Sequence, residues 1–450
     1  EFNSLTPFSG DLLYEGNILV NVSFANASNA TINLYDSLGA LVNSTVNNSG
    51  SPFFLNFSGL SSGVYYFNVT GLSGDVVNNS VTRNVLVINP SASGNGSVKL
   101  SYKINESRFG NGNELNLGEF GSSIANLGDL DGDGIQDIAV GEFENADGDS
   151  NNGAVWILFL NTNRTVKSSY KINESRFGNG NELSSGRFGS SITNLGDLDG
   201  DGIQDIAVGE FENADGDSYN GAVWILNLNT NGSVKSSYKI NESRFGNGNE
   251  LSGDKFGISI ANLGDLDRDG VQDIAVGDFL NDDGESLNGA IWILFLNTNG
   301  TVKSSYKINE SRFGNGNELG GNFFGGSIAN LGDLDGDGIQ DIAVGETSND
   351  DGGNSNGAIW ILNLNTNGSV KSSYKINESR FGNGNELSND GFGISIANLG
   401  DLDGDGVQDI VVGGGSNDDG GDGNGAFWIF FMNINGTVKS EYKINESRFG

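Results

Sequence analysis

Five acidic loops of nine residues are the parts of this sequence that could do chemistry. The first loop, Asp129–Asp137, carries carboxylates at positions one, three, five and nine. Its copies recur at a constant spacing of 68 residues and begin at Asp197, Asp265, Asp333 and Asp401. Two unit charges about 4 Å apart repel by roughly 4 kcal/mol at an effective dielectric constant near 20. No basic residue recurs beside the loops in the sequence, so a hard cation is the expected partner.

The ligands that each loop offers are those that calcium prefers. Four carboxylates, the backbone carbonyl of position seven and a water supply the six to eight oxygens of a calcium site. Gly134 permits the sharp chain reversal that turns three side chains inward. Magnesium resists dehydration and suits such an all-protein site less well. We therefore predict about five bound calcium ions, one in each loop.

The predicted calcium ligands stand at positions one, three, five, seven and nine of every loop. They are Asp129, Asp131, Asp133, Ile135, Asp137, Asp197, Asp199, Asp201, Ile203, Asp205, Asp265, Asp267, Asp269, Val271, Asp273, Asp333, Asp335, Asp337, Ile339, Asp341, Asp401, Asp403, Asp405, Val407 and Asp409. The alternative is a solvated Asp/Gly turn, which five copies without drift disfavour. Arg268 stands between two ligand positions of the third loop, and we expect it to weaken that site modestly.

Composition excludes several classes of function. The chain has 58 acidic and 23 basic residues, for a net charge of −35, whereas nucleic-acid binding needs a basic surface. It has no cysteine and no histidine, which excludes disulfides, Ser-His-Asp triads and Cys-His pairs. No apolar run approaches the ~18 residues needed to span a bilayer. We therefore expect no nucleic-acid partner, no membrane span in this chain and no enzyme activity.

The 68-residue repeats predict short strands. In the first repeat the strand-like runs are residues 98–104, 120–127, 137–141 and 154–160. The last run is apolar on both faces, as in a fully buried strand, and no useful helical periodicity occurs. Four strands per unit at this period predict the blades of a β-propeller. The predicted fold class is all-β: an N-terminal β-sandwich followed by a β-propeller of four-stranded blades, with five repeats of 68 residues present.

The repeats resemble FG-GAP repeats, the blades of the integrin α-subunit propeller and of many microbial surface proteins. A Phe-Gly pair precedes each loop. In the first repeat the loop is followed by Asp-Ile-Ala-Val-Gly and then by Asn-Gly-Ala-Val-Trp-Ile. The pairs are Phe120-Gly121, Phe188-Gly189, Phe256-Gly257, Phe324-Gly325 and Phe392-Gly393. The resemblance runs from about residue 97 to the chain end, and it implies that the loop residues hold calcium position by position. Two features depart from it: the "GAP" triplet is replaced, and five units are present where integrin propellers have seven.

One strand-like run is surplus to five four-stranded blades. The run Val-Lys-x-x-Tyr-Lys-Ile occurs six times, beginning at Val98, Val166, Val234, Val302, Val370 and Val438. The other three runs occur five times each. Either further repeats complete a larger ring, or one terminal strand, such as that in residues 437–450, pairs head to tail with a neighbouring subunit in a filament or lattice.

Three other recurring features are interpreted as structural. Trp156 and its counterparts stand mid-strand and are predicted to be core residues between blades. The charged residues of Tyr102–Arg108 and its copies are predicted to form a solvated face. A second acidic stretch, residues 145–153, drifts between repeats and therefore suits a surface turn better than a second metal site.

The first ninety residues differ from the repeats. Five short, nearly alternating apolar runs between residues 18 and 88 favour a small antiparallel β-sandwich. Leu60–Tyr65 resembles the tyrosine corner of immunoglobulin-like domains, although their Cys and Trp markers are absent. We expect an immunoglobulin-like β-sandwich at residues 1–94. We expect the FG-GAP propeller at residues 95–450, with repeats that could continue beyond the chain end.

Asn-x-Ser/Thr sequons are abundant. Calcium loops suit a calcium-rich exterior, and sequons accept glycan in secreted proteins, so we predict an extracellular or cell-surface location. The alternative is that sequons arise by chance in a chain rich in Asn, Ser and Thr. The glycosylation candidates are Asn21, Asn26, Asn43, Asn56, Asn68, Asn105, Asn163, Asn173, Asn231, Asn241, Asn299, Asn309, Asn367, Asn377, Asn435 and Asn445.

Three functional hypotheses from different classes follow. The favoured one is a non-enzymatic calcium-binding surface protein for adhesion or for surface or filament architecture, in which calcium rigidifies each blade. Its partner would be a protein or glycan ligand on another surface, or further copies of itself. The second is a propeller appendage of a larger enzyme whose catalytic domain lies outside this chain. The third, a self-contained hydrolase, would need catalytic Asp/Glu pairs, and these carboxylates are already explained as metal ligands.

Overall fold

The computed structural model divides into two compact units, Glu1–Tyr102 and Lys103–Gly450. Between residues 11 and 88 it describes eight strands. Beyond them it describes residues 103–105, 115, 118–146, 151–177, 182–183, 185–214, 219–245, 250–251, 253–282, 287–313, 319, 322–350, 355–381, 387, 390–416 and 424–445. Within these described residues, no helix is both long and apolar enough to cross a membrane.

The N-terminal unit consists of two sheets. The larger has the order β1-β8-β6-β3-β4, with β7 also paired to β6, and the smaller pairs β2 with β5. Ile32 and Leu34 of β3 are fully buried and lie on the same face of the larger sheet. Its immunoglobulin-like character stays a prediction, since the side chains of Leu60–Tyr65 lie outside the described residues. The strands are β1 (Asp11–Tyr14), β2 (Ile18–Val22), β3 (Asn29–Tyr35), β4 (Leu41–Asn47), β5 (Phe53–Phe57), β6 (Gly63–Ser73), β7 (Val76–Asn79) and β8 (Arg83–Ile88).

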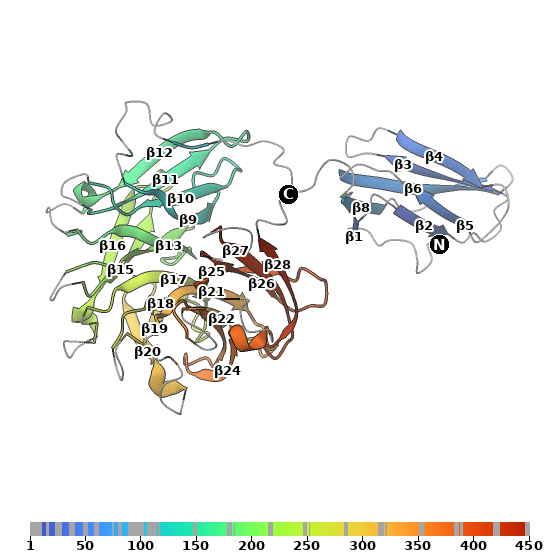
Figure 1. Ribbon diagram of the computed structural model, residues 1–450. Helices are drawn as coiled ribbons and strands as arrows, with labels where there is room; N and C mark the ends of the chain where they lie inside the picture. Colours follow the sequence, from blue (N-terminus) through green and yellow to red (C-terminus); the bar gives the residue numbers. More distant parts are fainter. Residues whose placement is uncertain are drawn as a thin grey trace. The chain divides into compact units, whose positions relative to one another are not determined.

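The second unit is a β-propeller, as predicted. Five four-stranded antiparallel sheets follow one another along the chain, and the strands within each sheet keep their sequence order. The first strands of consecutive sheets lie beside each other around a common axis (Figure 1). We call the sheets blades 1 to 5, from β9–β12 to β25–β28. The predicted all-β fold class is therefore confirmed.

The strand bounds repeat with the 68-residue period. The first strands are β9 (Phe120–Gly128), β13 (Phe188–Gly196), β17 (Phe256–Gly264), β21 (Phe324–Gly332) and β25 (Phe392–Gly400). The second are β10 (Asp137–Glu142), β14 (Asp205–Glu210), β18 (Asp273–Asp278), β22 (Asp341–Glu346) and β26 (Asp409–Gly414). The third are β11 (Ala154–Leu160), β15 (Ala222–Leu228), β19 (Ala290–Leu296), β23 (Ala358–Leu364) and β27 (Ala426–Met432).

The fourth strand of each blade is the Val-Lys run that follows its third strand. These strands are β12 (Val166–Ile172), β16 (Val234–Ile240), β20 (Val302–Ile308), β24 (Val370–Ile376) and β28 (Val438–Asn445). Short 3-10 helices follow the first four: η2 (Glu174–Arg176), η3 (Glu242–Arg244), η4 (Glu310–Arg312) and η5 (Glu378–Arg380).

This assignment corrects the expected role of the terminal copies. Residues 103–105 of the first Val-Lys run lie outside any strand, and residues 98–102 lie outside the described part of the chain. At the other end, β28 pairs with β27 from Ala426↔Asn445 to Met432↔Val438, so this copy is the fourth strand of blade 5. Pairing of a terminal strand with a neighbouring subunit stays a prediction. The surplus copy is the one that begins at Val98.

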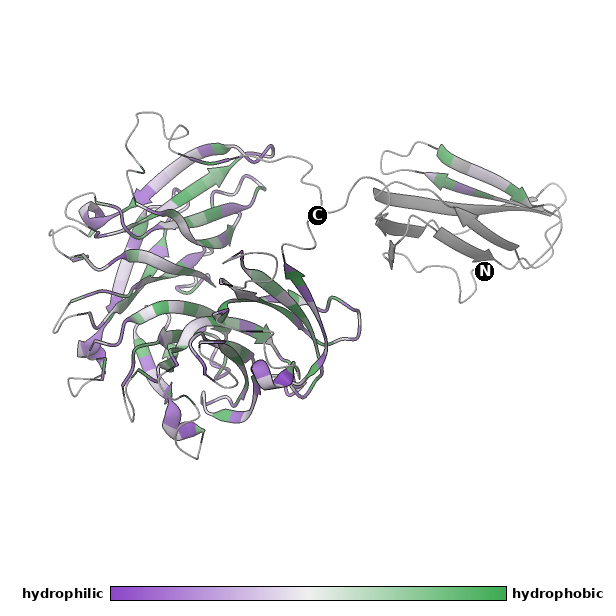
Figure 2. Cartoon of the chain, viewed as in Figure 1, coloured by the Kyte–Doolittle hydropathy of each residue, from purple (hydrophilic) through white to green (hydrophobic). Residues whose placement is uncertain are grey.

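The hydrophobic core lies between blades. Ile157 and Phe159 of β11 pack in one cluster with Phe188 and Trp224 of blade 2, and three further clusters join the later blades in the same way. Trp156 points to the opposite face of β11 and belongs to a separate, smaller cluster. Because successive strand residues face opposite sides, a blade between two neighbours needs apolar residues throughout its third strand. Figure 2 shows the third strands as largely hydrophobic.

The Phe-Gly pair makes the joint between blades. Phe188 N–H donates to the Asn152 carbonyl at 3.0 Å, and the Gly189 carbonyl accepts a hydrogen bond from Ser123 Oγ at 2.7 Å. The two backbones approach so closely that side chains do not fit between them. A Cβ at Gly209, for example, would lie 2.0 Å from the next blade's Gly257 carbonyl oxygen. Glycine is therefore a steric requirement of the joint.

We predict that Gly209→Ala destabilises the propeller, because its methyl group would force blades 2 and 3 apart. Overpacking of this kind costs about 1–3 kcal/mol, enough to lower the melting temperature by several degrees. Thermal unfolding followed by circular dichroism would measure it. The matched control is Gly413→Ala in blade 5, where the added Cβ would meet Ser395 Oγ, a rotatable group of the same blade. Equal loss in the two variants would contradict the blade-joint interpretation.

Candidate metal centre

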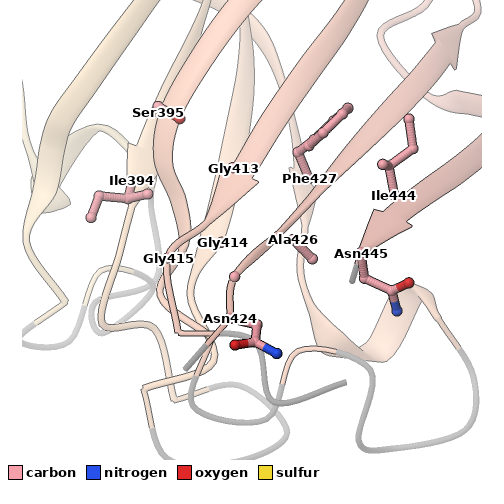
Figure 3. A pocket seen from close by; sticks show the side chains of 11 residues that line it. Ile394, Ser395, Gly413, Gly414, Gly415, Asn424, Ala426, Phe427, Ile444 and Asn445 are labelled. Carbon is pink, nitrogen blue, oxygen red and sulfur yellow. The ribbon is translucent and has the colours of Figure 1, made fainter. Parts of the chain in front are cut away.

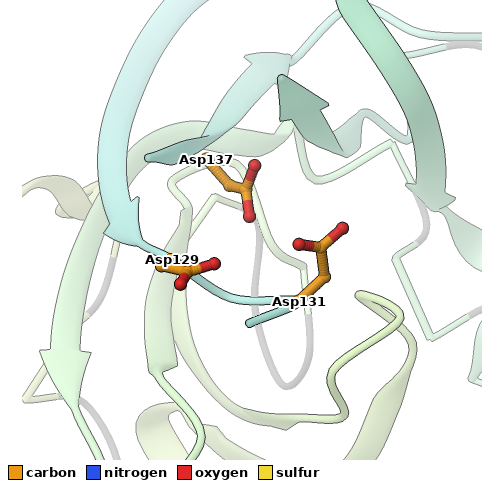
Figure 4. Close-up of side chains that lie close together, drawn as sticks. All are labelled: Asp129, Asp131 and Asp137. Carbon is orange, nitrogen blue, oxygen red and sulfur yellow. The ribbon is translucent and has the colours of Figure 1, made fainter. Parts of the chain in front are cut away.

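Each acidic loop connects the first strand of a blade to the second. In blade 1 it leaves β9 at Gly128 and enters β10 at Asp137. Figure 4 shows the side chains of Asp129, Asp131 and Asp137 gathered at this turn, where the two strands end. The antiparallel pairing of β9 with β10 holds the two ends of the loop together, so carboxylates eight residues apart in sequence become neighbours.

Every loop brings three carboxylates together. In four loops they come from positions one, three and nine, and in the third loop from positions one, three and five. One oxygen from each carboxylate lies within 4.8 Å of the other two. The clusters are Asp129/Asp131/Asp137, Asp197/Asp199/Asp205, Asp265/Asp267/Asp269, Asp333/Asp335/Asp341 and Asp401/Asp403/Asp409.

The aspartate at position nine also anchors the loop to the blade. Asp137 is buried, its Oδ2 accepts a hydrogen bond from Leu130 N–H and its Oδ1 accepts one from Leu160 N–H, both at 3.0 Å. Leu160 ends the third strand, so this carboxylate ties the loop to β11. The other four position-nine aspartates make the equivalent pair of bonds. Each oxygen keeps a second lone pair that can face a cation.

Backbone N–H groups shape the rest of the loop. Gly134 N–H donates to Asp129 Oδ2 at 2.8 Å, and Ile135 N–H donates to Asp133 Oδ1 at 3.0 Å. Gly134 has a φ of +86°, in the left-handed region that glycine adopts without strain. The side chains of positions one and five are thus folded back onto their own loop. The role of the position-seven carbonyl stays a prediction.

A lysine lies on every loop, which corrects the expectation that no basic group relieves the carboxylates. Lys167 Nζ lies 2.8 Å from Asp131 Oδ2 and 2.5 Å from Asp133 Oδ2. Lys235, Lys303, Lys371 and Lys439 contact positions three and five of their own loops in the same way. The lysine belongs to the fourth strand, 34 and 36 residues after the two aspartates that it contacts, so it is adjacent to them only in the fold. Its fixed place in the 68-residue repeat is the sequence signal that could have revealed it.

The third loop differs because of Arg268. This residue replaces a glycine of the other loops and adopts a φ of +66°, a conformation that costs a side-chain-bearing residue some strain. Its guanidinium donates to the Gly338 carbonyl of the fourth loop at 3.3 Å. Arg268 therefore points toward the neighbouring loop rather than into its own carboxylate cluster. The expected weakening of the third site stays a prediction.

The electrostatics of the loop divide it into two parts. Burial raises the pKa of Asp205 and Asp341 to about 6 and the pKa of Asp273 to about 7. Hydrogen bonding to Lys167 instead lowers the pKa of the exposed Asp133, and the pKa of Lys167 is raised in return. In the first four loops, position nine thus carries a charge that the fold disfavours. Position five is already neutralised by lysine in every loop.

The residues present fit a hard divalent cation. The clustered donors are all carboxylate oxygens, as calcium prefers. Within the described residues, Asp131 Oδ1 and Asp267 Oδ1 are buried and accept no hydrogen bond. A buried carboxylate oxygen without a donor is costly unless a cation or water faces it. The first and third loops therefore each contain a ligand atom that lacks a protein partner.

Another set of buried carboxylates was missed by sequence reasoning. Glu142 is fully buried on β10, accepts a hydrogen bond from the Trp156 indole at 2.7 Å and lies 3.9 Å from Lys171 Nζ. Glu174, in the copy of the Tyr-Lys-Ile-Asn-Glu-Ser-Arg segment, is also buried and accepts a hydrogen bond from Leu183 N–H. The prediction that this segment forms a solvated face is therefore wrong for its lysine and glutamate. These carboxylates already have protein partners, so we assign them to blade packing.

The tryptophans are core residues, as predicted. Trp224 packs against Phe177 with ring centroids 4.5 Å apart, and it is buried in the cluster between blades 1 and 2. Of the second acidic stretch, residues 147–150 lie outside the described part of the chain. Its interpretation as a surface turn stays a prediction.

Comparison with known proteins agrees with this geometry. Residues 120–158, 188–226 and 324–362 match the FG-GAP repeat. These stretches run from the first strand into the third strand of blades 1, 2 and 4, and each includes an acidic loop. Three of the five blades thus match this repeat by sequence. Residues 16–83, in the N-terminal unit, match the secretion system C-terminal sorting domain.

Curated relatives include several integrin α chains. Integrin alpha-4 of Xenopus laevis is 35% identical over 167 residues, which cover 37% of this chain and 15% of that protein. Integrin alpha-PS5 of Drosophila melanogaster is 32% identical over 35% of this chain and 15% of its own length. Integrin alpha-11 of Homo sapiens is 30% identical over 44% of this chain and 15% of its own length. The chain thus spans about 15% of the length of these relatives.

Among solved structures, a quinonprotein alcohol dehydrogenase-like protein from Bacteroides thetaiotaomicron aligns with 99% of this chain and 97% of its own. The identity is 10% and the TM-score 0.28, too low to support any inference. The FG-GAP and sorting-domain matches together indicate a secreted or cell-surface protein.

We predict that the metal-free protein loses stability as the pH rises from about 4 to about 7. The folded-state pKa of Asp205 is raised to about 6 by burial, and that of the buried Glu210 to about 7. The folded chain therefore binds more protons than the unfolded chain in this range, and unfolding becomes easier as the protons leave. Asp133 acts in the opposite direction only below about pH 4, since its pKa is lowered. Melting temperatures measured in chelator across this pH range would test the prediction.

The variant that isolates this effect is Asp205→Asn, which should flatten the pH dependence. Its control is Asp350→Asn, at an exposed aspartate outside the acidic loops. A melting temperature that rises between pH 5 and 7, or identical slopes in the two variants, would contradict the assignment.

Proposed function

We propose that this chain is a calcium-braced propeller of a secreted or cell-surface protein, and that it serves adhesion or surface architecture rather than catalysis. The FG-GAP repeats, the integrin α relatives and the sorting-domain match support the location and the adhesive role. The observation that carries the calcium claim is the carboxylate cluster with a buried, unpartnered oxygen at Asp131 and again at Asp267.

Calcium would act as a brace. When bound, the ion would neutralise the clustered carboxylates and connect both ends of the loop. Asp137 already joins the loop to the end of β11 through its two backbone hydrogen bonds. A cation on the same carboxylate would therefore couple the first, second and third strands of the blade. The proposed result is a rigid disc whose edges and loops present binding surfaces.

Lysine would take part of this role in the absence of calcium. Lys167 Nζ contacts the two loop positions, Asp131 and Asp133, that calcium would also use. One ammonium group can neutralise one charge of the pair, whereas a divalent ion can neutralise both. We propose that the lysine keeps the empty loop folded and competes with calcium for Asp133.

The partner would be a protein or glycan on another surface, or a second copy of this chain. The loops do not identify it, because their carboxylates turn inward toward a cation. N-linked glycan is proposed at one recurring sequon position that is exposed in all five repeats. Its asparagines are Asn163, Asn231, Asn299, Asn367 and Asn435.

We predict that the chain binds about five calcium ions and melts at least 10 °C lower in chelator than in calcium. Metal content measured by mass spectrometry and thermal unfolding with and without chelator would test this. Asp131→Ala should lower the content by one ion, because it removes a ligand that the fold aims at the site. Asp350→Asn is the control and should leave the content unchanged. Equal melting temperatures with and without calcium would refute the brace.

We predict that replacing all five loop lysines by methionine tightens calcium binding several-fold and lowers the melting temperature in chelator. The lysines are Lys167, Lys235, Lys303, Lys371 and Lys439. Methionine keeps much of the apolar stem but removes the competing charge. Calorimetric titration with calcium would measure the affinity. Lys255→Met is the control, since Lys255 pairs with Glu212 away from the loops. Weaker calcium binding in the five-fold variant would show that lysine positions the ligands instead of competing.

A further inference from the structure

The acidic loops of neighbouring blades lie beside each other. Asn194 Nδ2 donates to the Asn126 carbonyl of the preceding blade at 2.8 Å, close to the point where both strands enter their loops. The same bond recurs at 2.7–3.2 Å from Asn262 to Asn194, from Asn330 to Asn262 and from Asn398 to Asn330. Each loop is therefore held in a fixed position relative to the next, and a long side chain of one loop can reach its neighbour.

Arg268 is such a side chain. It stands at position four of the third loop, where the other loops have Gly132, Gly200, Gly336 and Gly404. Its φ of +66° lies in the same left-handed region as the +79° to +80° of these glycines, so the backbone of the loop keeps its course. The guanidinium extends to the fourth loop, where its Nη2 donates to the Gly338 carbonyl at 3.3 Å.

This contact places a positive charge beside the fourth carboxylate cluster. Asp337 directly precedes Gly338 in the chain, and Lys371 already contacts Asp337 at 2.6 Å. Hydrogen bonding to Lys371 lowers the pKa of Asp337, and the charge of Arg268 lowers it further. The fourth loop therefore has two cationic side chains beside position five, one from its own blade and one from the preceding loop.

The second loop has the same nine residues as the fourth loop but a different neighbour. Lys235 contacts Asp199 and Asp201 at 2.6 Å, as the lysine of the fourth loop contacts its own pair. Position four of the preceding loop is Gly132, which brings no charge. The two loops thus offer identical ligands to a cation, and Arg268 is the difference between their surroundings that the sequence repeat does not share.

We propose that Arg268 makes the fourth loop the weakest of the calcium sites, so that this loop fills last as the calcium concentration rises. A guanidinium keeps its charge at any working pH and repels a divalent ion on the neighbouring carboxylates. Calcium must bind against this charge or displace the guanidinium from Gly338. The proposal rests on the calcium binding proposed above and adds an order of filling to it.

The alternative is that Arg268 weakens its own loop, the third. Its backbone strain acts there, and the carboxylate cluster of that loop contains Asp269 in place of the position-nine aspartate. The two possibilities affect different sites, so removing one site at a time separates them. Asp267→Ala removes a position-three ligand from the third loop, and Asp335→Ala removes the equivalent ligand from the fourth loop.

The first experiment titrates the full chain with calcium and follows the bound ions by calorimetry and native mass spectrometry. In the chain that carries Asp267→Ala, the further change Arg268→Gln should tighten the weakest binding step about five- to tenfold, because the repelling charge is lost. In the chain that carries Asp335→Ala, the same change should leave every step unchanged. Equal tightening in both chains, tightening only with Asp335→Ala, or no tightening in either chain overturns the proposal.

Salt gives an independent measure of the role of charge. Raising the ionic strength from 0.1 M to 1 M shortens the screening length from about 10 Å to about 3 Å. The ratio of fourth-site affinities between Arg268→Gln and the wild type should therefore fall toward one. Arg268→Lys keeps the charge and should bind calcium like the wild type. A ratio that does not change with salt shows that strain causes the difference, and it overturns the proposal.

The second experiment transfers the effect to another pair of loops. Gly200→Arg places an arginine at position four of the second loop, where a Cβ meets nothing within 4 Å. In the chain that carries Asp335→Ala, it should weaken the third site about five- to tenfold. With Asp267→Ala, which removes that site, it should have no such effect. Gly200→Ala is the matched control, since it imposes the backbone strain without the charge, and an equal weakening by Gly200→Ala overturns the proposal.

Ile394→Arg is the control for net charge. Ile394 is 57% exposed in a groove of blade 5 (Figure 3), near the start of β25, whereas the acidic loop follows the end of that strand. This variant adds the same charge far from the loops and should leave the calcium affinities unchanged. Melting temperatures in chelator report whether each variant folds. A chain that binds no calcium overturns the proposed brace and the order of filling together, whereas calcium binding that is insensitive to Arg268→Gln overturns only the order of filling.

Discussion

The close approach of backbones between neighbouring blades is the constraint on which this structure depends. A four-stranded sheet with an apolar third strand such as β11 cannot bury both of its faces alone, so each blade needs a neighbour on either side. The Phe-Gly pair and the facing glycines bring the sheets into direct contact, and the clusters of Ile, Leu, Phe and Trp fill the remaining space.

The acidic loops place a second constraint, the repulsion between clustered carboxylates, at one end of each blade. Three carboxylates meet where the first two strands turn, and one of them is buried against the N–H groups of Leu130 and Leu160. Such an arrangement is unfavourable unless positive charge is nearby. The fold supplies lysine to positions three and five and leaves an oxygen of Asp131 for another partner. The loop thus combines a structural anchor with a cation-binding cluster.

Both features contribute to the stability of the blades. The loops and the buried Glu142–Trp156 pair lie inside or at the ends of blades and have protein or proposed metal partners. The proposed adhesion would therefore be carried by other residues of the propeller surface.

Much of the fold and of the candidate site could be predicted from the sequence, because the same local pattern recurs five times at a spacing of 68 residues. The spacing of Asp129, Asp131, Asp133 and Asp137 determined the acidic turn, and the apolar run at Ala154–Leu160 determined a strand buried on both faces. Phe120-Gly121, followed by these motifs, determined the propeller. Each of these signals depends on neighbours within about 40 residues, which is why periodicity and turn chemistry were sufficient.

Only the tertiary structure decided which groups meet across longer distances. It placed Lys167 on Asp131, and it buried Glu174 where a solvated face was expected. It also assigned the five Val-Lys runs from Val166 onward to the blade before them rather than the blade after them. Strand pairing and blade packing set these contacts. The 68-residue period does not decide them, because it is the same whether a Val-Lys run forms the last strand of one blade or the first strand of the next.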